Sequence, residues 1–392
     1  MSFTPASAFI PFSPPQIGPE EEHELLEALR SGWITTGPRV RAFEAATAAM
    51  AGATHGVATF SCTDAMLVAL AAFGVGPGDE VITTPYTFIS TAQVILHRGA
   101  RPVFVDVDPR TFNIDPARIE AAITPRTRGI MPVHFAGQVC DMDAILAIAR
   151  RHGLFVIEDA AHAFGAIHNG HPVGTLGDVA CFSFYATKNI TTAEGGMAVT
   201  SDADLAQRMR VLSMYGISDA REIWQKRYTR AGNIHYDVQE LGYKCNMTDL
   251  CAALGLVQLR RMDAIAAARR SYAAIYDEAF ADLPVTTPHV APYAGHAWHL
   301  YPLLLDLDRI SLSRDEVVLR LKECNVGTSV MFTPLHLFSY FQREMGFNEG
   351  DFPVAEDLFS RVVCLPMSPA LGEERIRKVA ETVAHVVTEG AR

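Results

Sequence analysis

Two short segments carry side chains that could do chemistry together. Asp159 ends the apolar run at 154–157. Lys188 follows a second apolar run, at 179–184, and is one of only five lysines in the chain. Each run predicts a buried parallel strand, and the carboxyl ends of such strands border the crevice where α/β folds bind ligands. A carboxylate and an amine placed there are what a pyridoxal phosphate (PLP) enzyme needs, to hold the pyridine nitrogen protonated and to attach the cofactor.

These residues also have ordinary structural explanations. Asp159 could cap the helix that follows it, and His162 could be a satisfied polar residue beneath the sheet edge. A lysine is most often a surface residue, with a pKa of about 10.4. The apolar run before Lys188 and the glycine turn at 195–196 favour a functional lysine instead. An amine that acts as a nucleophile must be desolvated or held covalently.

A phosphate site is predicted at residues 61–65, between a strand at 57–60 and a helix that opens at Asp64. The amino end of a helix offers free N–H groups and a positive dipole end, although Ser61 or Thr63 could simply cap the helix. Phe88 follows another strand end, where its ring could stack on a cofactor or pack in the core. The glycines at 74–78 follow a helix and precede a strand, which is the reverse of a dinucleotide fingerprint and predicts a turn.

The bulk composition narrows the classes of protein. A formal charge of −11 disfavours nucleic-acid and acidic-membrane binding. An anionic substrate would need local cations, and Arg221, Arg227, Arg230 and Lys244 lie in one basic, aromatic-rich stretch that could instead be a solvated loop. Seven cysteines without a CxxC pair indicate buried thiols, and no metal site is expected. With no leader and no apolar run of about 18 residues, the prediction is a cytoplasmic protein without a membrane span.

Helical and strand signals alternate from about residue 38 to 200, which predicts a mainly parallel sheet covered on both faces. A long helical stretch then runs from 248 to about 280, and shorter elements from 297 to 392 fit a smaller α/β domain. We expect an N-terminal segment at 1–30, a large domain at 31–260 and a smaller one at 261–392. The expected strands are 80–84, 102–106, 130–134 and 154–159, and the expected helices are 64–74, 91–97, 115–123 and 141–151.

Several motifs together resemble the DegT/StrS family of sugar aminotransferases, which are fold-type I PLP enzymes. The resemblance extends over nearly the whole chain. It implies a mainly parallel seven-stranded sheet between helices, with a smaller C-terminal α/β domain. The motifs are SGWITTGP at 31–38, SCTDA at 61–65, PYTF at 85–88, PVHFAG at 132–137, EDAAHAFG at 158–165, SFYATKNITTAEGG at 183–196, GYKCNMTDL at 242–250, AWHLY at 297–301 and PLH at 334–336.

The resemblance also implies roles for single residues. Lys188 would attach the cofactor and move the proton, Asp159 would bind the pyridine nitrogen, and His162 would contact the oxygen on the ring. Asn246 would reach the cofactor phosphate of a neighbouring subunit in a homodimer with shared sites, although it could also cap its own helix. The phosphate contacts implied are Thr63, Asp64 and Ser183, the stacking residue is Phe88, and the substrate contacts are Tyr86, Tyr185 and His336.

The implied reaction moves an amino group from L-glutamate to a nucleotide-linked 4-keto sugar, for surface polysaccharide, lipid A or a secondary metabolite. The motifs are most similar to those of enzymes that form UDP-4-amino-4-deoxy-L-arabinose. The alternatives are a ketocyclitol (scyllo-inosose type) aminotransferase, a PLP-dependent sugar dehydratase, and a non-catalytic sensor. The dehydratases replace the lysine by histidine, so Lys188 disfavours that branch. Many relatives carry His or Tyr where this chain has Met331-Phe332, which alters the expected sugar contacts.

Overall fold

A seven-stranded sheet forms the centre of the computed structural model, which describes residues 3–218 and 236–391. The strand order is β1-β9-β8-β5-β4-β2-β3. Within these ranges β9 pairs antiparallel with both neighbours, and the other pairs in the sheet are parallel. The mainly parallel seven-stranded sheet predicted from the sequence is therefore confirmed. Its strands are β1 (His55–Thr59), β2 (Glu80–Thr83), β3 (Arg101–Phe104), β4 (Thr127–Ile130), β5 (Phe155–Asp159), β8 (Val179–Ser183) and β9 (Gly196–Thr200).

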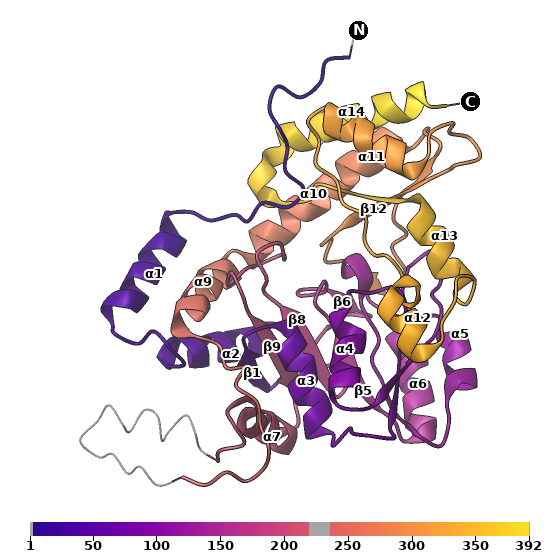
Figure 1. Ribbon diagram of the computed structural model, residues 1–392. Helices are drawn as coiled ribbons and strands as arrows, with labels where there is room; N and C mark the ends of the chain where they lie inside the picture. The colour runs from indigo at the N-terminus through magenta and orange to yellow at the C-terminus, as the bar shows by residue number, and fades with distance from the viewer. Residues whose placement is uncertain (1–2, 219–235, 392) are drawn as a thin grey trace.

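Helices cover both faces of this sheet (Figure 1). One apolar core joins the sheet to α3, α4 and α7, and another joins it to α2, α6 and α9. Both faces of the sheet are therefore buried, as is usual for parallel strands. The helices of this region are α1 (Pro19–Arg30), α2 (Pro38–Met50), α3 (Cys62–Ala72), α4 (Ser90–His97), α5 (Pro116–Ile119), α6 (Met142–His152), α7 (Ala203–Ser213) and α9 (Asp249–Arg260).

A third apolar core lies in the C-terminal part of the chain. It packs α10, α11 and α14 on the antiparallel sheet β10-β12-β13. A small third sheet, β11-β6-β7, joins residues 294–295 to the region after β5. The domain boundaries at 30 and 260 stay predictions. The remaining elements are β6 (Ile167–His168), β7 (His171–Pro172), β10 (Val285–Thr286), β11 (Ala294–Gly295), β12 (Tyr301–Leu305), β13 (Val362–Leu365), α10 (Met262–Phe280), α11 (Arg314–Glu323), α12 (Ser339–Met345), α13 (Pro353–Arg361) and α14 (Gly372–Glu389).

Three predicted elements differ from the observed ones. The strand expected at 130–134 is β4, which ends at Ile130, because Pro132 has no N–H to donate and Val133 only bridges to Asp159. The helix expected at 248–280 is two helices that meet at Arg261, whose backbone leaves the helical conformation. The helix expected at 115–123 is one α-helical turn followed by a 3₁₀ turn at Glu120–Ala122.

Other local predictions are confirmed. The glycines at 74–78 form a turn between α3 and β2, and Gly74 and Gly78 adopt positive φ angles that suit glycine. Gly153 ends α6 in the left-handed conformation, as expected for a stop signal. Across residues 3–218 and 236–391, we find no helix with the length and apolar character that crossing a membrane would require.

Candidate active site

A cavity of about 400 Å³ opens at the carboxyl ends of β5 and β8. Its size is typical of a site for a small ligand. Seven of the residues predicted from the sequence line this cavity together, although their positions in the sequence span more than a hundred residues. They are Thr63, Phe88, Asp159, His162, Ser183, Tyr185 and Lys188.

Asp159 is held in place by hydrogen bonds from neutral groups. The Thr91 hydroxyl donates to one carboxylate oxygen over 2.7 Å, and the Ala161 N–H donates to the other over 3.2 Å. Burial raises the pKa of this carboxyl, and the hydrogen bond from Thr91 opposes that rise. The bond to Ala161 is the local contact that the capping explanation expected, but the carboxylate also lines the cavity. Asp159 can therefore accept a further hydrogen bond from a bound group.

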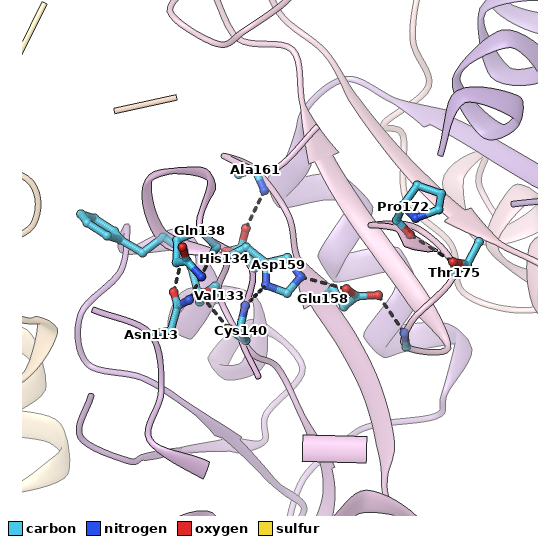
Figure 2. Close-up of polar contacts among 12 residues, drawn as sticks. Asn113, Val133, His134, Gln138, Cys140, Glu158, Asp159, Ala161, Pro172 and Thr175 are labelled. Atoms are coloured by element: carbon cyan, nitrogen blue, oxygen red, sulfur yellow. Dashed lines mark hydrogen bonds and ion pairs between the residues drawn. The ribbon is translucent and has the colours of Figure 1, made fainter. Parts of the chain in front are cut away.

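Glu158, the preceding residue, turns away from this cavity. Figure 2 shows that it points toward His134, whereas Asp159 is bonded to Ala161. The His134 ring and the Glu158 carboxylate are fully buried and 2.8 Å apart. His134 Nδ1 accepts the N–H of Cys140, so its proton lies on Nε2 and is donated to Glu158. This hydrogen-bonded pair holds the end of β5 in place on the side that faces away from the cavity.

Lys188 lies in the turn after β8, partly exposed to the cavity. Its side chain makes no hydrogen bond to the described residues. Burial lowers the pKa of Lys188 to about 8, while nearby Cys62 and Asp159 act in the opposite direction. An amine with this pKa is partly uncharged near neutral pH, unlike an ordinary lysine. The structure therefore gives Lys188 the desolvated setting that a nucleophilic amine needs.

The amino end of α3 forms the polar end of the cavity. Ser61 caps the helix, since its hydroxyl accepts the Asp64 N–H and donates to the Asp64 carboxylate. The N–H groups of Cys62 and Thr63 precede that bond and find no acceptor in the described residues, so they are free for an anion. Gly196 lies against this loop, where a Cβ atom would come within 2.2 Å of Ser61. Helix capping and a free anion site thus coexist here.

Aromatic rings line another part of the cavity. The Phe332 ring stacks on His162, with centroids 5.8 Å apart, and lies 6.1 Å from Phe88. His162 Nδ1 accepts the Ala136 N–H, so its remaining proton is on Nε2. Burial and the Lys188 charge lower the pKa of His162 well below its usual range, which keeps the ring neutral. These rings can pack on a flat ligand and offer it one N–H donor.

Four predicted site residues do not line the cavity. Asp64 is occupied with Ser61 at the helix cap. Tyr86 is buried and donates its hydroxyl to the Met331 carbonyl, so it supports the segment that carries Met331 and Phe332. His336 is buried against Glu356, 2.7 Å away. Asn246 donates to Thr36 and accepts from Lys244 within its own chain.

Two further outcomes concern the same region. Helix α9 is capped by Thr248 and not by Asn246, so the capping explanation for Asn246 was wrong. Of the predicted basic stretch, Arg221, Arg227 and Arg230 lie outside the described residues. Lys244 is described, and its ammonium lies 6.0 Å from the centre of the Tyr215 ring.

The sequence reasoning assigned no site role to Thr91, Phe332 or His299. Thr91 bonds Asp159 from the first turn of α4, and its place at the start of the helix predicted at 91–97 is the only signal that the sequence offered. Phe332 lines the cavity, but it was considered only as part of a departure from the family pattern. His299 also lines the cavity, and nothing in its local pattern indicates this.

Comparisons with known proteins agree with the PLP chemistry predicted for Lys188 and Asp159. The model of the DegT/DnrJ/EryC1/StrS aminotransferase family matches residues 15–384. The spore coat polysaccharide biosynthesis protein SpsC of Bacillus subtilis (strain 168) is 50% identical over 381 residues, which cover 97% of either chain. The PLP form of Spr1654 from Streptococcus pneumoniae is 32% identical with a TM-score of 0.91, covering 98% of this chain and 100% of that one. DesI, solved in the presence of its TDP-sugar product, is 34% identical with a TM-score of 0.87, covering 98% and 94%.

The lowered pKa of Lys188 leads to a direct prediction. In the full-length chain freed of cofactor, trace labelling with acetic anhydride over a pH series should modify Lys188 with a midpoint near pH 8. The uncharged amine is the reactive form, and burial favours that form. Peptide mass spectrometry gives the labelled fraction, with the exposed Lys322 as internal reference. If Lys188 and Lys322 showed the same midpoint, the desolvated setting of Lys188 would be refuted.

Proposed function

Because the chain belongs to the DegT/DnrJ/EryC1/StrS aminotransferase family, we propose that this PLP-dependent sugar aminotransferase moves an amino group from L-glutamate to C4 of a nucleotide-linked 4-keto sugar. The observation that carries the proposal is the presence of Lys188 and Asp159 in one cavity with a free helix amino end. Lys188 in the cavity disfavours the dehydratase branch, which carries histidine in its place, and the presence of both Lys188 and Asp159 disfavours a non-catalytic sensor.

The cavity suits PLP in four respects. Free N–H groups at Cys62 and Thr63, with the Ser183 hydroxyl, would hold the phosphate. Asp159, with one side open to the cavity, would accept the N–H of the pyridine ring. Phe88 would stack on the ring, and His162 would donate to its oxygen. Bound PLP supplies an electron-accepting ring that carries the amino group between donor and acceptor.

Lys188 performs two tasks in this proposal. It attaches the cofactor, and once released it takes a proton from one carbon and returns it to another. With a pKa of about 8, about one tenth of the amine is uncharged at pH 7 and ready to accept a proton. Asp159 must stay ionised throughout, and the hydrogen bonds from Thr91 and Ala161 favour its charged form against the effect of burial.

Two observations support a nucleotide-linked sugar as the acceptor. The structural relative DesI was solved with a TDP-sugar product, and SpsC is named for polysaccharide biosynthesis. Met331 and Phe332 give the cavity an apolar surface that has no strong side-chain hydrogen-bond donor. A sugar face without hydroxyl groups would pack there at little cost. The proposal covers UDP- and dTDP-linked sugars, including the UDP-4-keto-pentose that the motifs favour.

We further propose a homodimer whose two sites are shared. Asn246 forms a β-bridge with Thr59, and Thr59 lies two residues before Ser61, where the predicted phosphate site begins. Asn246 therefore lies at the edge of the anion site. Phe60, which follows Thr59, is exposed, and so are Val238 and Leu241 in the segment that leads to Asn246, the last of them 93%. Large exposed apolar side chains of this kind are typical of an interface. A partner bound there would bring a second copy of Asn246 near the phosphate end, as a two-fold axis requires.

The role of Asp159 can be tested by an isosteric change. Asp159→Asn should lower the turnover rate by about a thousandfold, or about 4 kcal/mol, because the amide cannot stabilise a protonated pyridine. The protein should still fold and bind PLP, which circular dichroism and cofactor absorbance would show. Turnover within tenfold of the wild type would contradict the assignment.

The substrate class is tested by a panel of acceptors. We expect purified protein with L-glutamate to release 2-oxoglutarate when given UDP- or dTDP-linked 4-keto sugars, with the new amine at C4 by NMR. Lys188→Met serves as the control for uncatalysed turnover. Amination of a ketocyclitol alone, or at C3 of the sugar, would refute the proposal.

The shared site predicts complementation. Lys188→Ala and Asn246→Ala are each expected to be inactive or weak, but a mixed dimer has one site with both residues intact. Subunit exchange should therefore restore activity to about half of the wild-type value per mixed dimer. If mass spectrometry verifies exchange and no activity returns, Asn246 acts only within its own chain.

A further inference from the structure

His299 is a second imidazole of the cavity, and none of the roles above involves it. It is buried, it lines the cavity with Lys188, and its ring centre lies 4.4 Å from that of His162. Its position is set by Asn189, the residue that follows Lys188. The Asn189 amide donates to the Ala297 carbonyl over 2.9 Å, and its oxygen lies 3.0 Å from His299 Nδ1.

These contacts fix the tautomer of His299. Because the Asn189 nitrogen is used by the Ala297 carbonyl, its oxygen is the atom that faces the ring, and an oxygen there can only accept. His299 therefore carries its proton on Nδ1 and has a lone pair on Nε2. Among the described residues, no donor is bonded to that lone pair. His162 has the opposite arrangement, with its proton on Nε2.

The surrounding charges keep the ring neutral. Burial lowers the pKa of His299 well below its usual range, and the charges of Lys188 and Arg269 act in the same direction. Arg269 is 2% exposed and donates to the carbonyls of Trp298 and His299, over 3.0 and 3.2 Å. No carboxylate is bonded to it among the described residues. Because this buried cation donates to two backbone carbonyls, it holds the segment at 298–299 in place.

The backbone around His299 is also unusual. Trp298 adopts a φ of +51°, and Ala136 adopts a φ of +58°. The Ala136 carbonyl accepts the N–H of His299, and its own N–H is donated to His162. Such conformations cost free energy and persist only where the surroundings enforce them. Both imidazoles are thus held by one strained, tightly bonded part of the backbone.

We propose that His299 is a positioning residue for the transfer reaction, whose Nε2 lone pair accepts a hydrogen bond from the Lys188 amine once that amine has been released from the bound cofactor. The inference rests on the proposed role of Lys188. A released lysine amine has donors to satisfy in a dry site, and an unpaired one is costly. The other titratable groups that face Lys188 are Asp159, Cys62 and His162. Of these, His162 presents a proton, and Asp159 is committed to the pyridine nitrogen.

The first test measures the pKa of Lys188 in full-length chains that hold pyridoxamine phosphate, by trace labelling over a pH series. In this form Lys188 is unattached and Asp159 is engaged by the pyridine nitrogen. His299→Leu should lower the labelling midpoint of Lys188 by about one pH unit, because the charged amine loses its acceptor. His299→Gln, which keeps an acceptor oxygen, should restore most of it. His296→Leu is the matched control, since His296 stacks on Trp298 in the same segment but does not line the cavity.

An unchanged midpoint in His299→Leu would overturn the proposal, as would an equal shift in His296→Leu, which would indicate a merely structural role. Should His299→Leu fail to fold, the wild-type chain labelled with ¹⁵N-histidine gives the answer by NMR. We expect an Nδ1–H tautomer and an Nε2 resonance that follows the titration of Lys188 and stops doing so in Lys188→Met. An Nε2–H tautomer would refute the proposal. Neither measurement uses a sugar, so its failure and that of the proposed substrate are separate results.

Discussion

The structure depends above all on keeping an amine and a carboxylate together in a place with little water. Each charged group loses hydration there, which lowers the pKa of Lys188 and raises that of Asp159. Their positions at the ends of β8 and β5 bring them into one crevice only because the strands are adjacent and parallel. Helices on both faces of the sheet keep water away from the strands. The fold therefore holds reactive groups in a state that they would not adopt in solution.

Much of this arrangement follows from the sequence. A parallel strand has a recognisable apolar run, and the residue at its carboxyl end must lie at the ligand edge, so Asp159 and Lys188 could be located without coordinates. Ser61 and the start of α3 follow from the same rule for helix ends. The family resemblance added His162 and Ser183, whose local patterns are not distinctive. The fold class was accessible because strand and helix periods are local properties.

Other residues could not be placed this way, because local patterns do not show which side of a turn faces a cavity. In the segment at 85–88, Thr87 and Phe88 line the cavity whereas Tyr86 points back to the Met331 carbonyl. His336 carries a suitable side chain but is paired with Glu356 in the interior. His299 lies more than a hundred residues after Lys188, and bonds from the neighbouring Asn189 to Ala297 and His299 join the two segments. Such long-range contacts appear only when the chain is folded.

The apolar surface formed by Met331 and Phe332 comes from a different part of the chain than the residues that would perform the chemistry. Tyr86 fixes the Met331 carbonyl, so the position of this surface does not depend on which side chains it carries. Replacements at 331 and 332 can therefore change what fits the cavity while Lys188 and Asp159 keep their surroundings. During evolution, such a separation lets a gene duplicate acquire a new acceptor through a few changes and retain its catalytic ability at every step.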